Sequence, residues 1–347
     1  MGLPNFYLHE CGTGGGVFTT GGSESILIAV IAARYHAIKR LKKSQEEKPD
    51  NCFLPKLVMY FSEDAHSCIE KTANICMVKK RKVETDECFR LTGCALEKVI
   101  KEDIAKGLVP FMVISTMGST STTACDKISE IAEICQRYPN IWLHIDAAYG
   151  GNTLICPEFR YLVEGIECSD SFNCNPHKLL NSLVDCAAVY FKDVCKVKEA
   201  MHVCRHTVNS EEGDDYGDWS ISLSRRLRGL KLWYVLRSYG IEGLQHLIRA
   251  QCCLAKCFKT LVKQDERFEI LNDVKMGLVC FRLREGNEKT KQLFDSISKE
   301  GQIILSPTVV KQKQIIRLCI TNEKTEEEDI HTAWNIIKRH ADKILKC

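Results

Sequence analysis

The sequence predicts an α/β protein whose main sheet is largely parallel. Short, almost continuous apolar segments alternate with segments of helical periodicity, a pattern typical of parallel strands covered on both faces by helices. The chain has 347 residues, of which 45% are hydrophobic and 27% are charged. This is enough for one large or two moderate domains with an apolar core. Polar residues directly follow several apolar segments, which indicates a ligand site at one edge of the sheet.

Five apolar segments are the expected strands of the main sheet, at residues 56–61, 111–116, 141–146, 170–173 and 186–191. In a parallel sheet, ligands bind at the C-terminal ends of the strands. At those ends the sequence places four polar sites, namely residues 62–66, residues 116–120, Asp146 and residues 175–178. If each of these were only a solvated loop, such a convergence would not be expected.

A glycine-rich segment near the start of the chain precedes a predicted helix at residues 25–40. Small residues at a helix N-terminus let backbone amides approach an anion, so Gly21, Gly22 and Ser23 are candidates for binding a phosphate. Glycines before a helix are also common in ordinary turns. The spacing of Gly12 and Gly14 is too weak a signal for a dinucleotide-binding fingerprint.

The rest of the chain predicts a smaller C-terminal α+β domain, residues 237–347, after a large domain of residues 1–236. Its first part has a helical pattern in which Gly240 and Gly243 mark a break. Thr325 with Glu328 has the form of a capping box, which opens a final amphipathic helix packed on a small sheet. The helical ranges are 231–263 and 325–345, and the strand-like ranges are 268–283, 302–307 and 315–321.

Charge and hydropathy argue against several classes of protein. Lys and Arg outnumber Asp and Glu by only 48 to 45, and the two signs are interleaved, so no nucleic-acid partner is expected. The basic run at residues 79–82 is interpreted as a solvated turn or helix edge. The sequence has no apolar run long enough to span a bilayer and no signal-peptide pattern at its start, so we expect a cytoplasmic protein without a membrane partner.

The chain contains 20 cysteines, but their spacing is scattered and no Cys-x-x-Cys pair occurs. The sequence therefore predicts no metal site, and free thiols in a reducing cytosol rather than a disulfide framework. The densest cluster, Cys252, Cys253 and Cys257, has helical spacing and is expected to face a core or a groove.

One carboxylate and one amine form the most informative pair in the sequence. Asp146 ends the third expected strand, and Lys178 lies in the polar segment after the fourth. A lysine can form an imine with the aldehyde of pyridoxal phosphate, while an aspartate keeps the pyridine nitrogen of that cofactor protonated. Taken singly, the Asp is more often a helix cap and the Lys a solvated surface charge. Together they predict a pyridoxal phosphate site.

A series of motifs in one order resembles the group II pyridoxal-phosphate-dependent amino acid decarboxylases, in particular the aromatic-L-amino-acid and histidine decarboxylase branch. The resemblance covers nearly the whole chain and implies the pyridoxal-phosphate-dependent transferase fold type I. The matching motifs are Ala65-His66-Ser67, Asp146-Ala147-Ala148-Tyr149, Cys156-Pro157-Glu158-Phe159-Arg160, Asp170-Ser171-Phe172-Asn173, Asn175-Pro176-His177-Lys178, Arg225-Arg226 and Gly277-Leu278-Val279-Cys280-Phe281-Arg282-Leu283.

The resemblance implies a role for each matching residue. Lys178 would bond to the cofactor aldehyde, and Asp146 would pair with the pyridine nitrogen. His66 and Ala148 would contact the two faces of the ring, and Thr120 would lie near it. The contacts at the phosphate end would come from Gly22, Ser23, Asn175 and His177.

The resemblance also implies a mobile lid at residues 205–219, in which Tyr216 would donate the proton that replaces the lost carboxylate. Relatives that act as aromatic aldehyde synthases differ at the positions of Tyr216 or His66. Both residues are present here, so simple decarboxylation to an amine is preferred over aldehyde formation.

The resemblance leaves the substrate open between an aromatic amino acid and histidine. Ser224 matches histidine-using relatives, whereas His177 is typical of the aromatic-using branch, and we favour an aromatic substrate. A homodimer is expected because the family builds each site from both subunits. Family members carry a long segment before the position of Gly14, so a catalytically weak protein that binds the cofactor or a partner subunit is a further alternative.

Overall fold

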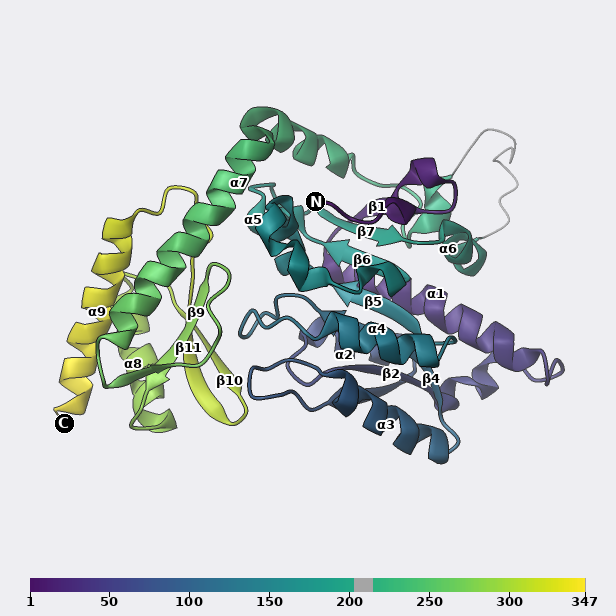
Figure 1. Ribbon diagram of the computed structural model, residues 1–347, viewed down its shortest axis with the longest axis horizontal. Coiled ribbons are helices and arrows are strands. Elements are labelled where there is room, and N and C mark those ends of the chain that lie inside the picture. Colours follow the sequence, from purple (N-terminus) through teal and green to yellow (C-terminus); the bar gives the residue numbers. More distant parts are fainter. Residues whose placement is uncertain (203–214, 347) are drawn as a thin grey trace. The chain divides into compact units, whose positions relative to one another are not determined.

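The computed structural model describes residues 1–202 and 215–346 and divides the chain into two compact units (Figure 1). The large unit comprises Met1–Gly118 and Cys125–Gly240, and the small unit comprises Ser119–Ala124 and Ile241–Cys347. The boundary predicted after residue 236 lies four residues before the end of the large unit. Nothing in the sequence indicated that residues 119–124 belong to the small unit.

Among the described residues, seven strands of the large unit form one sheet in the order β1-β7-β6-β5-β4-β2-β3. Strands β2 to β6 are all parallel to one another, whereas β7 is antiparallel to both β6 and β1. The predicted α/β class with a mainly parallel sheet is therefore confirmed. The strands are β1 (Gly15–Thr19), β2 (Leu57–Ser62), β3 (Lys79–Val83), β4 (Val109–Thr116), β5 (Trp142–Asp146), β6 (Ser171–Cys174) and β7 (Ala187–Phe191).

Helices cover both faces of this sheet, which explains why its central strands are apolar on both sides. In β2, alternate residues enter different cores: Met59 packs with α1, α2 and α6, whereas Tyr60 packs with α3 and α4. The helices of the large unit are α1 (Gly22–Lys42), α2 (Ser67–Ile75), α3 (Gly93–Ala105), α4 (Ile128–Arg137), α5 (Pro176–Leu179), α6 (Val194–Met201) and the first part of α7 (Arg228–Lys263).

Strands β1 and β3, at the two edges of the sheet, were not predicted. The interpretation of residues 79–82 as a turn or helix edge is wrong, because they form most of β3. Their charges are paired with acidic residues, since Glu70 binds both Lys80 and Lys82 at 2.7 and 2.9 Å. Lysines on an edge strand discourage pairing with another chain, so a basic run is compatible with this position.

The small unit contains a four-stranded antiparallel sheet in the order β10-β11-β9-β8. The second part of α7 packs on this sheet together with α8 and α9 around Phe258, Phe281 and Trp334, as the predicted α+β pattern implies. The elements are β8 (Phe268–Ile270), β9 (Leu278–Leu283), α8 (Asn287–Glu300), β10 (Ser306–Val310), β11 (Lys313–Cys319) and α9 (Glu327–Leu345).

Three local predictions in this region need correction. The capping box of α9 is formed by Glu326 and Asp329, one residue later than predicted, because the carboxylate of Glu326 accepts the N3 amide. The break in α7 is at Gly240, whose φ of 65° departs from the helical range, and Gly243 is helical. The strand expected at residues 302–307 lies later, at β10. No helix of the described part of the chain is long and apolar enough to cross a membrane.

Candidate active site

The parallel strands bring the predicted site residues to one edge of the large sheet. Because β1 pairs antiparallel with β7, and β7 with β6, β1 runs in the same direction as β2, β4, β5 and β6. The C-terminal ends of these five strands therefore lie at the same edge. Gly21 follows β1, His66 follows β2, Asp146 ends β5 and Lys178 follows β6. The segments that carry these four residues therefore share one edge of the sheet, whereas Thr120 of the predicted segment 116–120 belongs to the small unit.

Asp146 is almost fully buried and is held by its neighbours on β5 and β6. Its Oδ1 accepts a hydrogen bond of 3.1 Å from the amide of Ala148 and one of 3.3 Å from the Nδ2 of Asn173. The register of the sheet explains the second contact, since Asp146 pairs directly with Asn173. These bonds orient the carboxylate at the strand end while it lies out of contact with bulk water.

A buried histidine continues this chain of hydrogen bonds. The ring nitrogens of His144 lie 2.7 Å from the Oγ of Ser171 and 2.8 Å from the Oδ1 of Asn173. Burial lowers the pKa of His144 to about 4, so the ring is neutral near pH 7. A neutral ring that donates from Nε2 to Asn173 directs the Asn173 amide nitrogen at Asp146. The sequence did not identify His144 or Asn173 as site residues.

This buried histidine makes stability depend on pH. An ordinary histidine has a pKa of about 6.5, so the unfolded chain binds a proton that folded His144 rejects, and stability falls as pH drops from 6.5 towards 4. Between pH 7 and pH 5 we expect the free energy of unfolding of the wild type to fall by about 2 kcal/mol more than that of His144→Gln. Urea unfolding at both pH values measures this difference. His246→Gln, at an exposed position, should behave like the wild type; an identical pH dependence in His144→Gln would contradict the assignment.

The loop after β6 packs beside Ala148 and the start of α1. The amide of Asn175 donates to the carbonyl of Ala148 at 3.1 Å. A β-carbon placed on Gly22 would lie 3.4 Å from the Cβ of Ala148 and 3.5 Å from the Nδ2 of Asn175. The absence of a side chain at Gly22 thus leaves space between these residues. Within the described residues, the buried Oδ1 of Asn175 has no hydrogen-bond partner, as expected of a group that can serve a ligand.

The N-terminus of α1 supplies backbone donors beside this space. Gly21 is the N-cap of the 21-residue helix, and no side chain caps it. Unsatisfied amides and the helix dipole favour an anion at such a position. Instead of capping the helix, the carboxylate of Glu24 turns back to accept from the backbone and hydroxyl of Thr20, at 2.7 and 2.8 Å.

Three predicted site residues affect the pKa of the buried Cys68 thiol. Burial and the Asp146 carboxylate raise the pKa of its thiol to about 11, while a hydrogen bond with Ser23 and the positive charge of Lys178 act in the opposite direction. Ser23 therefore bonds to this buried thiol, and Asp146 and Lys178 lie near enough to act on it electrostatically, although the three come from separate segments. The amide of Cys68 also donates to the Nδ1 of exposed His66 at 3.2 Å, which fixes that ring as the N-cap of α2.

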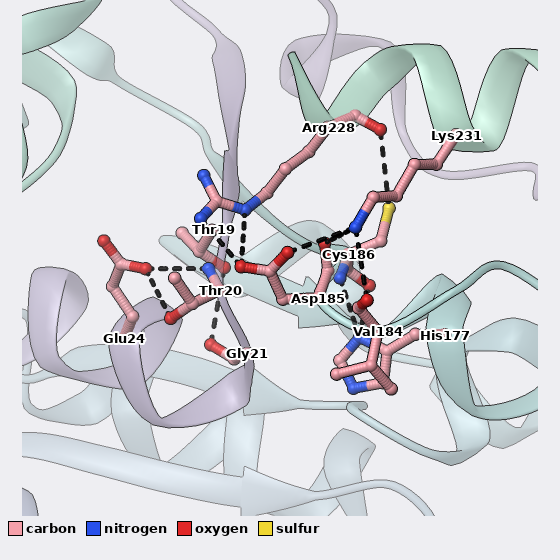
Figure 2. A network of polar contacts seen from close by, with 10 residues as sticks. All are labelled: Thr19, Thr20, Gly21, Glu24, His177, Val184, Asp185, Cys186, Arg228 and Lys231. Carbon is pink, nitrogen blue, oxygen red and sulfur yellow. Dashed lines mark hydrogen bonds and ion pairs between the residues drawn. The ribbon is translucent and has the colours of Figure 1, made fainter. Parts of the chain in front are cut away.

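His177, the neighbour of Lys178, is connected to an ion-pair network. Its Nδ1 lies 2.6 Å from the carbonyl oxygen of Cys186. The preceding Asp185 binds the Nη2 of Arg228 at 2.8 Å and the Nζ of Lys231 at 3.2 Å (Figure 2). The guanidinium of Arg228 holds the pKa of Asp185 well below its usual range. This network fastens the start of α7 to the strand that supports the Lys178 loop.

We expect Asp185→Asn to destabilise the protein, because it leaves the nearly buried guanidinium of Arg228 without a carboxylate. The loss should be about 2 kcal/mol in the free energy of unfolding, between the values for exposed and for fully buried ion pairs. Urea denaturation measures it. Asp50→Asn, which removes the partner of Lys42 in an exposed pair, is the matched control and should change stability by less than about 0.5 kcal/mol. Equal effects of the two substitutions would refute the role of the network.

The other predicted residues lie elsewhere. Tyr216 opens a short 3₁₀ turn (Tyr216–Trp219); its ring centroid is 5.0 Å from that of Trp219, and Arg225 lies over its ring. These contacts do not link Tyr216 to Asp146 or Lys178. Ser224 is exposed before α7, and Thr120 belongs to the small unit, where its carbonyl accepts from Arg317 at 2.5 Å. Residues 205–214 of the expected lid lie outside the described residues.

A cavity of about 510 Å³ in the large unit is lined by the residues that flank Ser224. Phe18 of β1, Tyr216, Leu223 and Leu227 form much of its wall. Arg228, which binds Asp185, lines it as well. Such a mixture of apolar and aromatic walls with a few polar groups is typical of small-molecule sites.

The residues at the sheet edge fit pyridoxal phosphate. The group needs a carboxylate at one end of its ring, an amine at its aldehyde, small or flat neighbours at its faces and donors for its phosphate. Asp146, Lys178, Ala148 and the start of α1 meet these requirements in turn. The unpartnered oxygen of Asn175 and the space at Gly22 lie where a ligand would complete the packing.

Comparisons with known proteins agree with this geometry. Residues 1–284 match the family model described as "Pyridoxal-dependent decarboxylase conserved domain". The aromatic-L-amino-acid decarboxylase of Manduca sexta is 41% identical over 100% of this chain and 69% of its own length. The histidine decarboxylase of Homo sapiens is 42% identical over 99% of this chain and 53% of its own length. The crystal structure of Oryza sativa TDC with PLP and tryptamine aligns with a TM-score of 0.93 and 32% identity, over 99% of this chain and 73% of that chain.

These findings confirm the predicted cofactor and the predicted class of enzyme. The chain therefore belongs to the pyridoxal-dependent decarboxylases, carboxy-lyases that use pyridoxal phosphate.

Proposed function

We propose that this protein decarboxylates an aromatic L-amino acid to the corresponding amine and carbon dioxide. The observation that carries the proposal is the position of Asp146 at the end of β5 and of Lys178 just after the neighbouring parallel strand β6. When bound, pyridoxal phosphate supplies an electron sink for the negative charge that remains as carbon dioxide leaves.

The chain's own residues have distinct tasks in this proposal. The backbone amides at Gly21, Gly22 and Ser23 bind the phosphate, since α1 presents them without a capping side chain. Asp146, oriented by Asn173 and Ala148, stabilises a positive charge on the ring nitrogen. A carboxylate that is already oriented does not have to rearrange in the transition state. This lowers the free-energy barrier of the reaction.

Two residues act on the reacting end of the site in this proposal. The Nζ of Lys178 would hold the cofactor at its aldehyde. The Oη of Tyr216 donates the proton to the α-carbon, as the family resemblance implies. Tyr216 is 44% exposed and lines the 510 Å³ cavity.

The walls of the 510 Å³ cavity support an aromatic side chain as the recognised group. Phe18, Leu223 and Leu227 offer apolar contact, and Tyr216 adds an aromatic ring. The aromatic-L-amino-acid decarboxylase of Manduca sexta supports the same class of substrate.

Histidine is the second candidate, and Ser224 is the observation that favours it. Ser224 lies between cavity residues Leu223 and Arg225, and a hydroxyl there offers a hydrogen bond to an imidazole nitrogen. We expect Ser224→Gly to raise the ratio of kcat/KM for aromatic substrates to kcat/KM for histidine by about 10-fold. Steady-state kinetics on both substrates measures the ratio. Ser222→Gly, two residues earlier, is the control, and the same ratio in wild type and Ser224→Gly would exclude Ser224 from substrate selection.

A substrate panel tests the proposed function directly. The purified protein, loaded with pyridoxal phosphate, is incubated with L-DOPA, 5-hydroxytryptophan, tyrosine and histidine, and carbon dioxide, amine and hydrogen peroxide are measured. We expect equal amounts of amine and carbon dioxide with at least one aromatic substrate. Peroxide with aldehyde would instead identify an aromatic aldehyde synthase. Cofactor absorbance without carbon dioxide from any substrate would identify a protein that binds without turnover.

We also infer that the protein acts as a homodimer. Leu230, Trp233 and Tyr234 at the start of α7 are 44%, 53% and 59% exposed, and Leu227 before them is 77% exposed. Their spacing of three and four residues gathers them on one side of the helix, and a cluster of this kind marks an interface. Light scattering after gel filtration should give twice the mass of one chain for the wild type and a lower mass for Trp233→Glu. A monomeric wild type would contradict the inference.

A further inference from the structure

The small unit holds a cluster of thiol, carboxylate and imidazole groups that the proposed reaction does not use. Cys257 lies in the second part of α7, while Glu327 and His331 lie in the first turns of α9. One ligand atom of each residue lies within 4.8 Å of the corresponding atoms of the other two. Glu327 and His331 are exposed and Cys257 is half-buried, so an ion from solvent can reach them.

The distances match those of a tetrahedral metal site. Bonds of about 2.0 to 2.3 Å to zinc place neighbouring ligand atoms of a tetrahedron about 3.3 to 3.8 Å apart. The Sγ of Cys257 lies 3.8 Å from the Oε1 of Glu327, and the Nε2 of His331 lies 3.7 Å from the same oxygen. Two of the three separations therefore already have the size that a shared ion requires.

The helices arrange further donors and charge around the cluster. Cys253 lies one turn before Cys257 on α7, and the two thiols are close enough to interact electrostatically. Both helices thus present an i,i+4 pair, the spacing that puts two side chains on one helix face. The first turn of α9 also contains Glu328 and Asp329, whose negative charges offset the positive end of the helix dipole that would oppose a cation.

We propose that Cys257, Glu327 and His331 bind a zinc ion, with a water molecule as the fourth ligand. Thiolate, imidazole and carboxylate together select zinc among common divalent ions, because magnesium and calcium prefer oxygen ligands alone. The ion would join α7 to α9 within the small unit and so stabilise the packing of that unit. The sequence predicted no metal site, since these ligands come from two helices about 70 positions apart rather than from a short motif.

Cobalt(II) in place of zinc gives the test a readout that is independent of catalysis. The full-length protein, loaded with pyridoxal phosphate and fully reduced, is titrated with Co²⁺ alone. We expect one equivalent with the strong visible bands of tetrahedral coordination and a thiolate charge-transfer band. Cys257→Ser and His331→Ala should each weaken zinc binding, measured against a competing chelator, by at least about 10-fold, since even the loss of a group that only orients a ligand costs that much.

The many other thiols make a matched control essential. Cys94→Ser removes an exposed cysteine of the large unit and should keep both the cobalt spectrum and the zinc affinity of the wild type. Zinc should raise the Tm of the wild type and of Cys94→Ser by about 4 °C at high excess over its Kd, and should not raise that of Cys257→Ser. A six-coordinate cobalt spectrum, or a spectrum that Cys257→Ser leaves unchanged, would overturn the proposal.

Discussion

Replacing Lys178 by alanine is expected to reduce kcat by about 10⁴-fold or more, the largest effect of any single substitution in this protein. Among the residues that act on the thiol of Cys68, namely Ser23, Asp146 and Lys178, it is Lys178 that carries an amine. Without this amine the protein would have no covalent bond to the cofactor. The amino group of the substrate would then have no such bond to replace. Steady-state release of carbon dioxide by the wild type and by Lys178→Ala measures the effect.

Peptide mapping identifies the cause of the loss. After borohydride reduction of the loaded protein, the added mass of the cofactor should appear on the peptide that contains Lys178, and no such peptide should form in Lys178→Ala. Lys106→Ala, at an exposed position of the large unit, is the control and should retain full activity. Full activity of Lys178→Ala, or modification of another lysine in the wild type, would contradict the assignment.

Replacing Asp146 by asparagine is expected to lower kcat by about 10²- to 10³-fold, the cost of removing one preorganised electrostatic group from an active site. An amide oxygen still accepts from Ala148 and Asn173, which are the two donors to Oδ1. The substitution therefore removes the negative charge and keeps the local geometry. Cofactor affinity and kcat are both measured, and the main change should be in kcat.

Two controls separate charge from packing. Asp146→Glu keeps the charge in a longer side chain and should recover part of the activity lost in Asp146→Asn. Asn173→Ala keeps the charge and removes one donor, so it should reduce activity less than Asp146→Asn does. If Asp146→Asn matched the wild type, a charge at the ring nitrogen would have no part in the reaction.

The site could be predicted from the sequence as far as it follows from strand direction. Asp146 directly ends an apolar run, and Lys178 follows the next one, so a parallel sheet necessarily brings both to one edge. Glycine and serine before an alanine-rich helix also predict a phosphate-binding terminus at the start of α1. These inferences need only local pattern and sheet geometry.

The residues that the sequence did not identify are those whose roles depend on pairing across strands. His144 and Asn173 are 29 positions apart, and their contact follows from the register between β5 and β6. A sequence pattern shows where a strand ends but not which residue lies opposite on its neighbour. Cys68 was likewise not singled out among the 20 cysteines of the sequence. It lies near the site residues because α2 begins beside α1.

Errors in the fold have a similar origin. Residues 79–82 are basic, and it is their partner Glu70, on a separate helix, that makes them suitable for an edge strand. At the start of α9, two candidate capping boxes overlap, because the predicted pair and the observed pair have the same spacing and differ by one position along the chain. The backbone alone decides between them. Both outcomes depend on structural context that overrides local preference.

An experimental structure of the protein with pyridoxal phosphate bound tests the central claim most directly. We expect continuous density from the Nζ of Lys178 to the cofactor, with the Asp146 carboxylate about 2.7 to 2.9 Å from the ring nitrogen, as in a charge-assisted hydrogen bond. A cofactor attached to another lysine, or a ring nitrogen that faces away from Asp146, would contradict it.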